Sequence, residues 1–239
     1  MSKLIIFLYG VLSYLLGVLG LLCIIAVLAR VMPWGFLSDV RTENSVAIVL
    51  NVILVLVWGV IHSIMARPSF KAWFTKIVPE AAERSTYVLV AGITSIALTG
   101  YWQNIDGYLW QIESGTLSTI LWGIFGFGWV FLLASTFAIN HFDLFGLRQV
   151  FYNLKNQPRP PLNFVKRAMY AYIRHPIQTG VLIGVWVTPI MSMTQVILSI
   201  GFTIYIIVGL RYEERDLIAE HGESYIKYKS ETGMVLPKF

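Results

Sequence analysis

The sequence predicts an all-α protein: a polytopic integral membrane helical bundle of about five to six transmembrane segments, with a C-terminal helical hairpin and a cytoplasmic tail helix. The first observation behind this prediction is composition, because 56% of the 239 residues are hydrophobic and only 13% are charged. Soluble domains carry about 25% charged residues, so this chain has too few charges to cover a water-exposed surface. Its hydrophobicity also excludes intrinsic disorder, and its single cysteine, Cys23, excludes a disulfide scaffold. The second observation is that the apolar residues form long runs.

Four of these runs are predicted to be transmembrane helices, at residues 4–31, 44–66, 85–102 and 117–139. They approach or exceed the length needed to cross a hydrocarbon core about 30 Å thick. The first run has the position of a signal peptide, but it is too long and lacks a small-residue cleavage site. We therefore expect it to be retained as a helix.

The apolar stretch 176–210 is different, because as a single helix it would measure about 52 Å at 1.5 Å per residue. Pro189 lies near its middle and predicts a break. We therefore expect a hairpin over 177–210, built of short helices at about 177–188 and 193–210.

The flanks of the hairpin are predicted to lie at the membrane surface. A helix at about 162–173, in which basic and aromatic residues alternate, suits the headgroup layer. The polar residues 211–239 form a cytoplasmic tail. No linker or composition shift separates a second domain, so residues 1–239 are predicted to form one membrane domain.

The basic residues indicate the orientation, because positive residues accumulate in cytoplasmic loops. Four Lys or Arg lie in loop 67–84, six in loop 140–175 and five in the tail, whereas loop 103–116 has none. An even number of crossings places these basic segments and both termini in the cytoplasm. The expected location is the bacterial inner membrane, where the protein contacts membrane lipids, and we expect no nucleic-acid partner.

The densest group of polar residues flanks the hairpin. Tyrosines and a basic pair precede it and two carboxylates follow it: Tyr170, Tyr172, Arg174, His175, Pro176, Glu213 and Glu214. A hairpin returns its ends to the same side, so these residues are expected to lie close together. Pro176 suits the first position of a helix, whose dipole would favour an anion near Arg174 and His175.

Two interpretations of this group stay open. Cationic groups beside carboxylates and tyrosines suit a zwitterionic amino acid joined to an aromatic ring, a description that fits S-adenosyl-L-methionine. Alternatively, Arg174 and Arg215 anchor the chain at the membrane surface, and the two glutamates pair with them there.

The order of these residues resembles the C-terminal signature of membrane methyltransferases, which include the isoprenylcysteine carboxyl and phospholipid methyltransferases. The signature is R-H-P-x-x-x-G, an apolar hairpin, E-E-x-x-L and G-x-x-Y-x-x-Y, and residues 174–180, 213–217 and 222–228 match it in that order. Three further segments, which begin at His62, Glu83 and Asn140, resemble the methanethiol S-methyltransferases and the related nuclear-envelope protein nurim. The resemblance extends from about residue 45 to the end of the chain.

The resemblance implies methyl transfer from S-adenosyl-L-methionine to a small thiol, methanethiol, giving dimethyl sulfide at a membrane-embedded site that faces the cytoplasm. It implies a cofactor site formed by Tyr170, Tyr172, Arg174, His175, Pro176, Gly180, Glu213 and Glu214. The two glutamates are expected to hold the cofactor's ammonium or to brace the basic groups. Gln178 departs from the pattern, because many relatives that act on prenylated or lipid substrates have Tyr there.

A thiol is far more nucleophilic as the thiolate, so a base near the acceptor is expected. His141, oriented by Asp143 or Asn140, and His62 are the candidates, and for each the alternative is a histidine hydrogen-bonded between helices. Asn140, Arg148 and Trp186 are candidate substrate contacts. Arg148 suits a lipid phosphate equally well, and Trp186 suits membrane packing.

Two other functions stay open. The acceptor is an isoprenylcysteine or a lipid in one of them, and in the other the chain is a non-enzymatic, nurim-like membrane protein. The basic pair at Arg174 together with the two glutamates argues against a purely structural role, which would not require that set. The sequence supports no metal site and implies no obligate protein partner.

Overall fold

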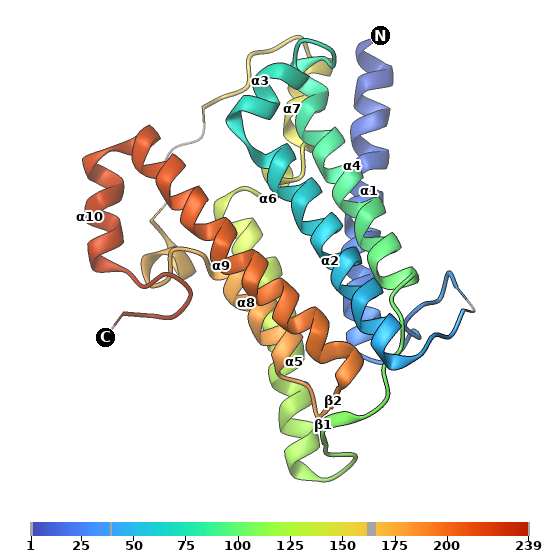
Figure 1. The fold of residues 1–239 in the computed structure, drawn as a ribbon. Coiled ribbons are helices and arrows are strands. Elements are labelled where there is room, and N and C mark those ends of the chain that lie inside the picture. Colours follow the sequence, from blue (N-terminus) through green and yellow to red (C-terminus); the bar gives the residue numbers. More distant parts are fainter. Residues whose placement is uncertain (1, 39, 162–165, 239) are drawn as a thin grey trace. The chain divides into compact units, whose positions relative to one another are not determined.

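The computed structural model describes residues 2–38, 40–161 and 166–238 (Figure 1). The chain forms two compact units. Unit 1 comprises Met1–Asn104 and Asn140–Asn163, and unit 2 comprises Ile105–Ile139 and Phe164–Phe239.

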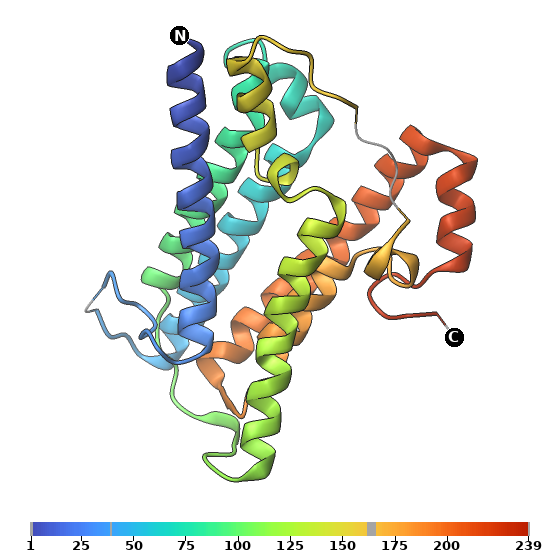
Figure 2. The ribbon, with the colours of Figure 1, turned by 180° about the vertical axis from the view of Figure 1, so that it is seen from behind.

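Unit 1 is helical. Its elements are α1 (Lys3–Leu28), α2 (Asn44–Ala66), α3 (Pro68–Phe74), α4 (Glu80–Gly100), α6 (His141–Leu144) and α7 (Leu147–Leu154). Helices α1 and α4 lie side by side in both views (Figures 1 and 2). A Cβ added to Gly92 of α4 would lie 2.3 Å from the carbonyl oxygen of Leu16 in α1. The two backbones are therefore in direct contact, as small residues permit between membrane helices.

Four of the described helices are long and apolar enough to cross a membrane: α1, α2, α5 (Thr116–Ile139) and α9 (Met193–His221). The chain is thus a polytopic membrane protein. The predicted bounds of α2 agree with the structure, and those of α1 and α5 differ by one to three residues. Helix α4 begins at Glu80, five residues before the predicted third span, and is not among the four because polar and charged residues fill its first turns.

Unit 2 contains the hairpin. Its elements are β1 (Tyr108–Gln111), α5, η1 (Ala168–Ala171), α8 (Pro176–Trp186), β2 (Ile190–Ser192), α9 and α10 (Glu223–Glu231). Helix α8 packs closely on α5 through a Gly-x-x-x-Gly pair. A Cβ on Gly180 would lie 2.6 Å from the carbonyl oxygen of Gly128, and one on Gly184 would lie 2.5 Å from the Trp129 ring. Gly180 therefore has a packing role in the structure.

The predicted break at Pro189 is confirmed, since α8 ends at Trp186 and α9 begins at Met193. The turn between them contains β2, which pairs antiparallel with β1, so the all-α prediction is wrong in this detail. Trp110 Nε1 donates a hydrogen bond to the Thr188 carbonyl (2.8 Å), and the Ile112 N–H donates to the Pro189 carbonyl (2.9 Å). Strands this short leave no periodic signal in a sequence.

Helix α9 supplies partners for the end of α8. The Val185 carbonyl accepts hydrogen bonds from Ser199 Oγ (2.7 Å) and Gln195 Nε2 (3.3 Å). Non-helical backbone at membrane depth is tolerated only where protein groups satisfy it. These side chains therefore explain how a short helix and an extended turn persist within an apolar stretch.

Two predictions about the hairpin's flanks need correction. Helix α9 continues to His221, well beyond the predicted end at 210, because Arg and Glu are good helix formers and no breaker precedes Gly222. Of the predicted surface helix at 162–173, residues 162–165 lie outside the described residues, and the remainder contains only the single 3₁₀ turn η1. The tail helix is present as α10, after a turn at Gly222 whose φ is +55°.

Candidate functional site

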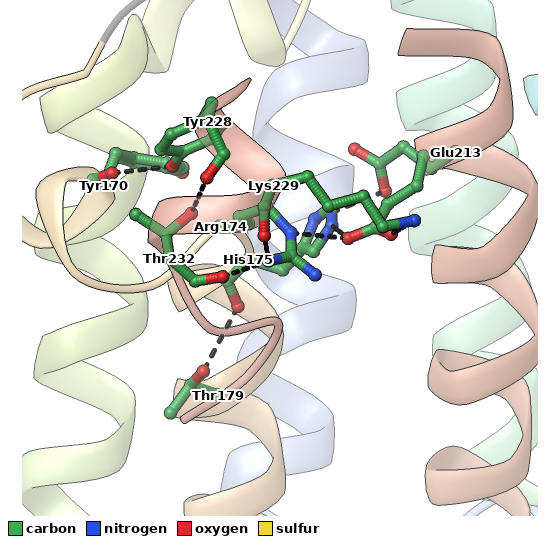
Figure 3. Close-up of polar contacts among 9 residues, drawn as sticks. Tyr170, Arg174, His175, Thr179, Glu213, Tyr228, Lys229 and Thr232 are labelled. Atoms are coloured by element: carbon green, nitrogen blue, oxygen red, sulfur yellow. Dashed lines mark hydrogen bonds and ion pairs between the residues drawn. The ribbon is translucent and has the colours of Figure 1, made fainter. Parts of the chain in front are cut away.

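The two ends of the hairpin meet in unit 2 at a group of five side chains, which we call the Arg174 cluster (Figure 3). Arg174 and His175 immediately precede α8, and the other members come from α9 and α10: Glu213, Glu214 and Lys229. The sequence expectation that the basic pair and the two glutamates lie close together is confirmed by these contacts.

Glu214 is the centre of the Arg174 cluster. Its side chain is 3% exposed, and its Oε1 accepts a hydrogen bond from Arg174 Nε at 2.6 Å. The same oxygen lies 3.3 Å from His175 Nε2, and Oε2 lies 2.8 Å from Lys229 Nζ. A buried carboxylate must be paired and hydrogen-bonded, so Glu214 braces the basic residues.

The C-terminal segment accepts further hydrogen bonds from Arg174 and from the backbone beside it. The guanidinium Nη1 donates to the carbonyl oxygens of Lys229 (3.1 Å) and Thr232. The backbone N–H groups of Arg174 and His175 donate to the carbonyls of Gly233 (2.9 Å) and Met234 (3.0 Å). The protein's own chain therefore uses both of these N–H groups, at the helix start near which the sequence predicted a bound anion.

His175 and Glu213 form the open side of the cluster. The Glu213 side chain is 51% exposed, and its Oε2 lies 3.9 Å from His175 Nδ1. Burial lowers the pKa of His175, although Glu213 and Glu214 act in the opposite direction, so the ring is neutral at pH 7. The hydrogen-bond network assigns the ring proton to Nε2, facing Glu214, and leaves Nδ1 as an acceptor. His175 Nδ1 and Glu213 Oε2 are then two acceptors that face each other. This arrangement suits a ligand that donates N–H groups from a cationic nitrogen.

Tyr170 supplies a buried donor beside this group. Its hydroxyl has no hydrogen-bond partner among the described residues, whereas its carbonyl accepts from the Tyr228 hydroxyl at 2.6 Å. Burial raises the pKa of Tyr170, and the charge of Glu213 adds to the effect, so the phenol stays protonated. Tyr172 is exposed. Carboxylates, a neutral histidine and an unpartnered phenol fit a zwitterionic ligand with an aromatic part.

Trp186 is tied to the other arm of the hairpin. Its Nε1 donates to Thr203 Oγ1 of α9 at 2.9 Å. This bond gives the side chain a structural partner in addition to its predicted substrate role.

Unit 1 holds a second group around His141, the buried first residue of α6. Its Nε2 lies 3.0 Å from the Tyr14 hydroxyl of α1, and the Phe145 ring lies 4.7 Å from the imidazole, centroid to centroid. Burial lowers the pKa of His141, which favours the neutral ring. Sequence reasoning missed Tyr14 because it lies 127 positions away within an apolar span, where no motif marks it.

The residues expected to orient His141 have other described contacts. The Asp143 carboxylate lies 3.4 Å from Arg159 Nη1 and 3.8 Å from Arg148 Nη1. The Asn140 side chain accepts a hydrogen bond from the Asp143 N–H and caps α6. Tyr14 therefore provides one hydrogen bond to the ring, and Arg148 is engaged with Asp143.

His62 is buried in α2, with Nδ1 2.7 Å from the Trp58 carbonyl oxygen. Nδ1 is therefore the protonated nitrogen, because a carbonyl only accepts. The Tyr87 ring meets the imidazole edge to face at 6.1 Å, and the Arg84 guanidinium covers Tyr87 at 4.9 Å. Arg84 Nε also donates to the Leu144 carbonyl at 2.6 Å. The segments that begin at His62, Glu83 and Asn140 thus contact one another within unit 1.

Comparison with known proteins places these residues in a family context. A family model described as NnrU protein matches residues 49–235. A methanethiol S-methyltransferase from Mycobacterium tuberculosis is 40% identical over 213 residues, which cover 85% of this chain and 87% of the relative. One from Crocosphaera subtropica is 36% identical over 238 residues, 99% of this chain and 93% of the relative. Nurim from Mus musculus is 23% identical over 192 residues, 77% of this chain and 73% of its own. No solved structure matches the chain significantly.

Proposed function

Because the chain belongs to the NnrU protein family, alongside the methanethiol S-methyltransferases, we propose that it methylates methanethiol to dimethyl sulfide. The observation that carries the proposal is the identity of 36–40% to these enzymes across most or nearly all of the chain. Nurim shares less of the sequence, at 23% identity.

The proposed methyl donor is S-adenosyl-L-methionine, which when bound supplies a methyl group activated by a sulfonium. The donor set of the Arg174 cluster supports this assignment. Glu213 and Glu214 are proposed to hold the ammonium, with His175 Nδ1 as a further acceptor, and the unpartnered Tyr170 hydroxyl is proposed to donate to the ligand. The other residues proposed for this site are Tyr172, Arg174, Pro176 and Gly180.

The protein's own chemistry in the reaction is alignment of the acceptor and removal of its proton. We assign the thiol proton to an imidazole, either His141 or His62. The thiol sulfur would form its new bond to the methyl carbon as the bond from that carbon to the sulfonium breaks, which would leave dimethyl sulfide and S-adenosylhomocysteine. A neutral ring is required, and the burial that lowers the pKa of His141 supplies one. We also propose Asp143 as a catalytic residue, and we propose that Asn140, Arg148 and Trp186 contact the substrate.

We further propose six crossings, cytoplasmic termini and one functional domain over residues 1–239, in the bacterial inner membrane. The β1–β2 pairing supports a full crossing by α8, because it joins the hairpin turn to the loop at 103–116, the loop without basic residues. Helix α8 is about 16 Å long, and extended residues 187–192 add about 20 Å, which together exceed a 30 Å core. Water-soluble maleimide should label a cysteine placed at Leu109 only from the periplasmic side.

The enzyme assignment is tested with the full chain purified in detergent, methyl-labelled cofactor and a panel of acceptors. Volatile labelled dimethyl sulfide, formed only when methanethiol is present, is the expected product. Labelling of a prenylated or lipid acceptor alone would replace the proposed substrate. Absence of both turnover and cofactor binding would favour a non-enzymatic, nurim-like protein.

A further inference from the structure

Lys229 already presents an ammonium group to Glu214. Its Nζ lies 2.8 Å from Oε2, and its side chain is 44% exposed whereas that of Glu214 is 3% exposed. Figure 3 shows the Lys229 side chain extending past Arg174, so that its nitrogen lies at the end away from the guanidinium, on the side of Glu213. The other carboxylate oxygen, Oε1, is held from within the protein by Arg174 and His175, both of which are buried. Lys229 is thus the exposed partner of a buried carboxylate.

The ε-ammonium of lysine and the α-ammonium of an amino acid are the same functional group, with one positive charge and three N–H donors. A lysine side chain is long and flexible, and an ion pair with an exposed partner is weak. A ligand ammonium that reaches Oε2 can therefore replace Lys229 while Glu214 keeps a compensating charge. The exchange leaves the backbone in place, since Arg174 Nη1 contacts the Lys229 carbonyl and not its side chain.

We propose that Lys229 sets the affinity for the cofactor by competing, through its own ammonium, for the Glu214 oxygen that receives the ligand's ammonium. This inference rests on the proposed function, because it requires an amino-acid ligand at the Arg174 cluster. According to this inference, Lys229 on α10 determines the affinity for the cofactor, a role that no sequence motif indicates.

The test is calorimetric titration of the detergent-purified full chain with two probes. S-adenosylhomocysteine carries the ammonium, and 5′-methylthioadenosine keeps the adenosine and sulfur but lacks the amino-acid part. Lys229→Met removes the competitor, and Lys227→Met removes the same charge from α10 two residues earlier. We expect Lys229→Met to bind S-adenosylhomocysteine about three- to fivefold more tightly. Lys227→Met should match wild type, and neither variant should change the affinity for 5′-methylthioadenosine.

Lys229→Arg should change the affinity for S-adenosylhomocysteine in the opposite direction. Its guanidinium can donate two N–H groups to the carboxylate, so it should weaken S-adenosylhomocysteine binding, and it keeps the test decisive if Lys229→Met unfolds. Unchanged or weaker S-adenosylhomocysteine binding by folded Lys229→Met would overturn the inference, as would equal tightening of both probes. If wild type bound neither probe, the proposed cofactor site itself would fail.

Discussion

Arg174 Nε and Glu214 Oε1 lie 2.6 Å apart in a buried ion pair that joins the start of α8 to α9. The pair closes the C-terminal hairpin across 40 positions of sequence. Because the C-terminal segment also bonds to Arg174, one guanidinium holds three parts of unit 2 together.

Glu214→Gln should destabilise the protein and abolish binding of S-adenosylhomocysteine. Removing one partner of a buried ion pair leaves an uncompensated charge, at a cost of about 3–5 kcal/mol. Thermal unfolding in detergent measures the first effect and calorimetry the second. Glu213→Gln is the matched control, because that side chain is exposed: it should weaken binding without lowering the unfolding temperature. Equal unfolding temperatures for Glu214→Gln and wild type would refute the bracing role.

Cofactor binding should weaken in acid. Burial places the pKa of His175 below its ordinary value, so Nδ1 accepts hydrogen bonds at pH 7 and loses that ability once the ring is protonated. The affinity for S-adenosylhomocysteine should be constant above the lowered pKa and decrease as the pH falls through it. The affinity for 5′-methylthioadenosine, which lacks the ammonium, should change less. An affinity for S-adenosylhomocysteine that increases on acidification would contradict the assignment of Nδ1.

Tyr14→Phe should lower the rate of methyl transfer about three- to tenfold, because the variant loses the free energy of one hydrogen bond to the proposed base. The variant should also shift the pH–rate profile. Tyr9→Phe is the control, because Tyr9 lies on the same helix and donates an equivalent bond to Thr86 Oγ1 at 2.8 Å. Both variants lose one interhelical hydrogen bond, so a purely structural effect would appear in both. Identical profiles for the two would remove Tyr14, and its partner His141, from the proton transfer.

Gly180→Ala should lower the unfolding temperature of the protein in detergent. Its Cβ would lie 2.6 Å from the Gly128 carbonyl oxygen, and overpacking of this kind costs about 1–3 kcal/mol. Gly126→Ala in α5 is the control, since its Cβ meets nothing within 4 Å and alanine is the better helix former. A neutral Gly180→Ala would show that α8 and α5 do not pack as described.

The sequence predicts much of this fold because apolar length and proline act locally. The bounds of α2 and the break at Pro189 follow from the composition of single segments. The bonds from Ser199 and Gln195 to the Val185 carbonyl do not, since they depend on tertiary packing. The same holds for β1, whose partner strand is distant in the chain.

The candidate site, too, has residues that the sequence predicts and residues that it does not. The ordered motif indicates Arg174, His175 and the glutamates, because hairpin geometry brings its two ends together. It does not distinguish the buried brace Glu214 from the exposed Glu213, and it gives no sign of Lys229 or of the C-terminal carbonyls. Those contacts depend on the reversal of the chain at Gly222, after which α10 returns toward α8.

The most direct test of the central claim is the formation of labelled dimethyl sulfide from methanethiol and methyl-labelled S-adenosyl-L-methionine by the purified full chain. We expect steady production by wild type and by Lys227→Met, and none by Glu214→Gln at a temperature where that variant is folded. No volatile product from wild type that binds S-adenosylhomocysteine would contradict the assignment of methanethiol as acceptor.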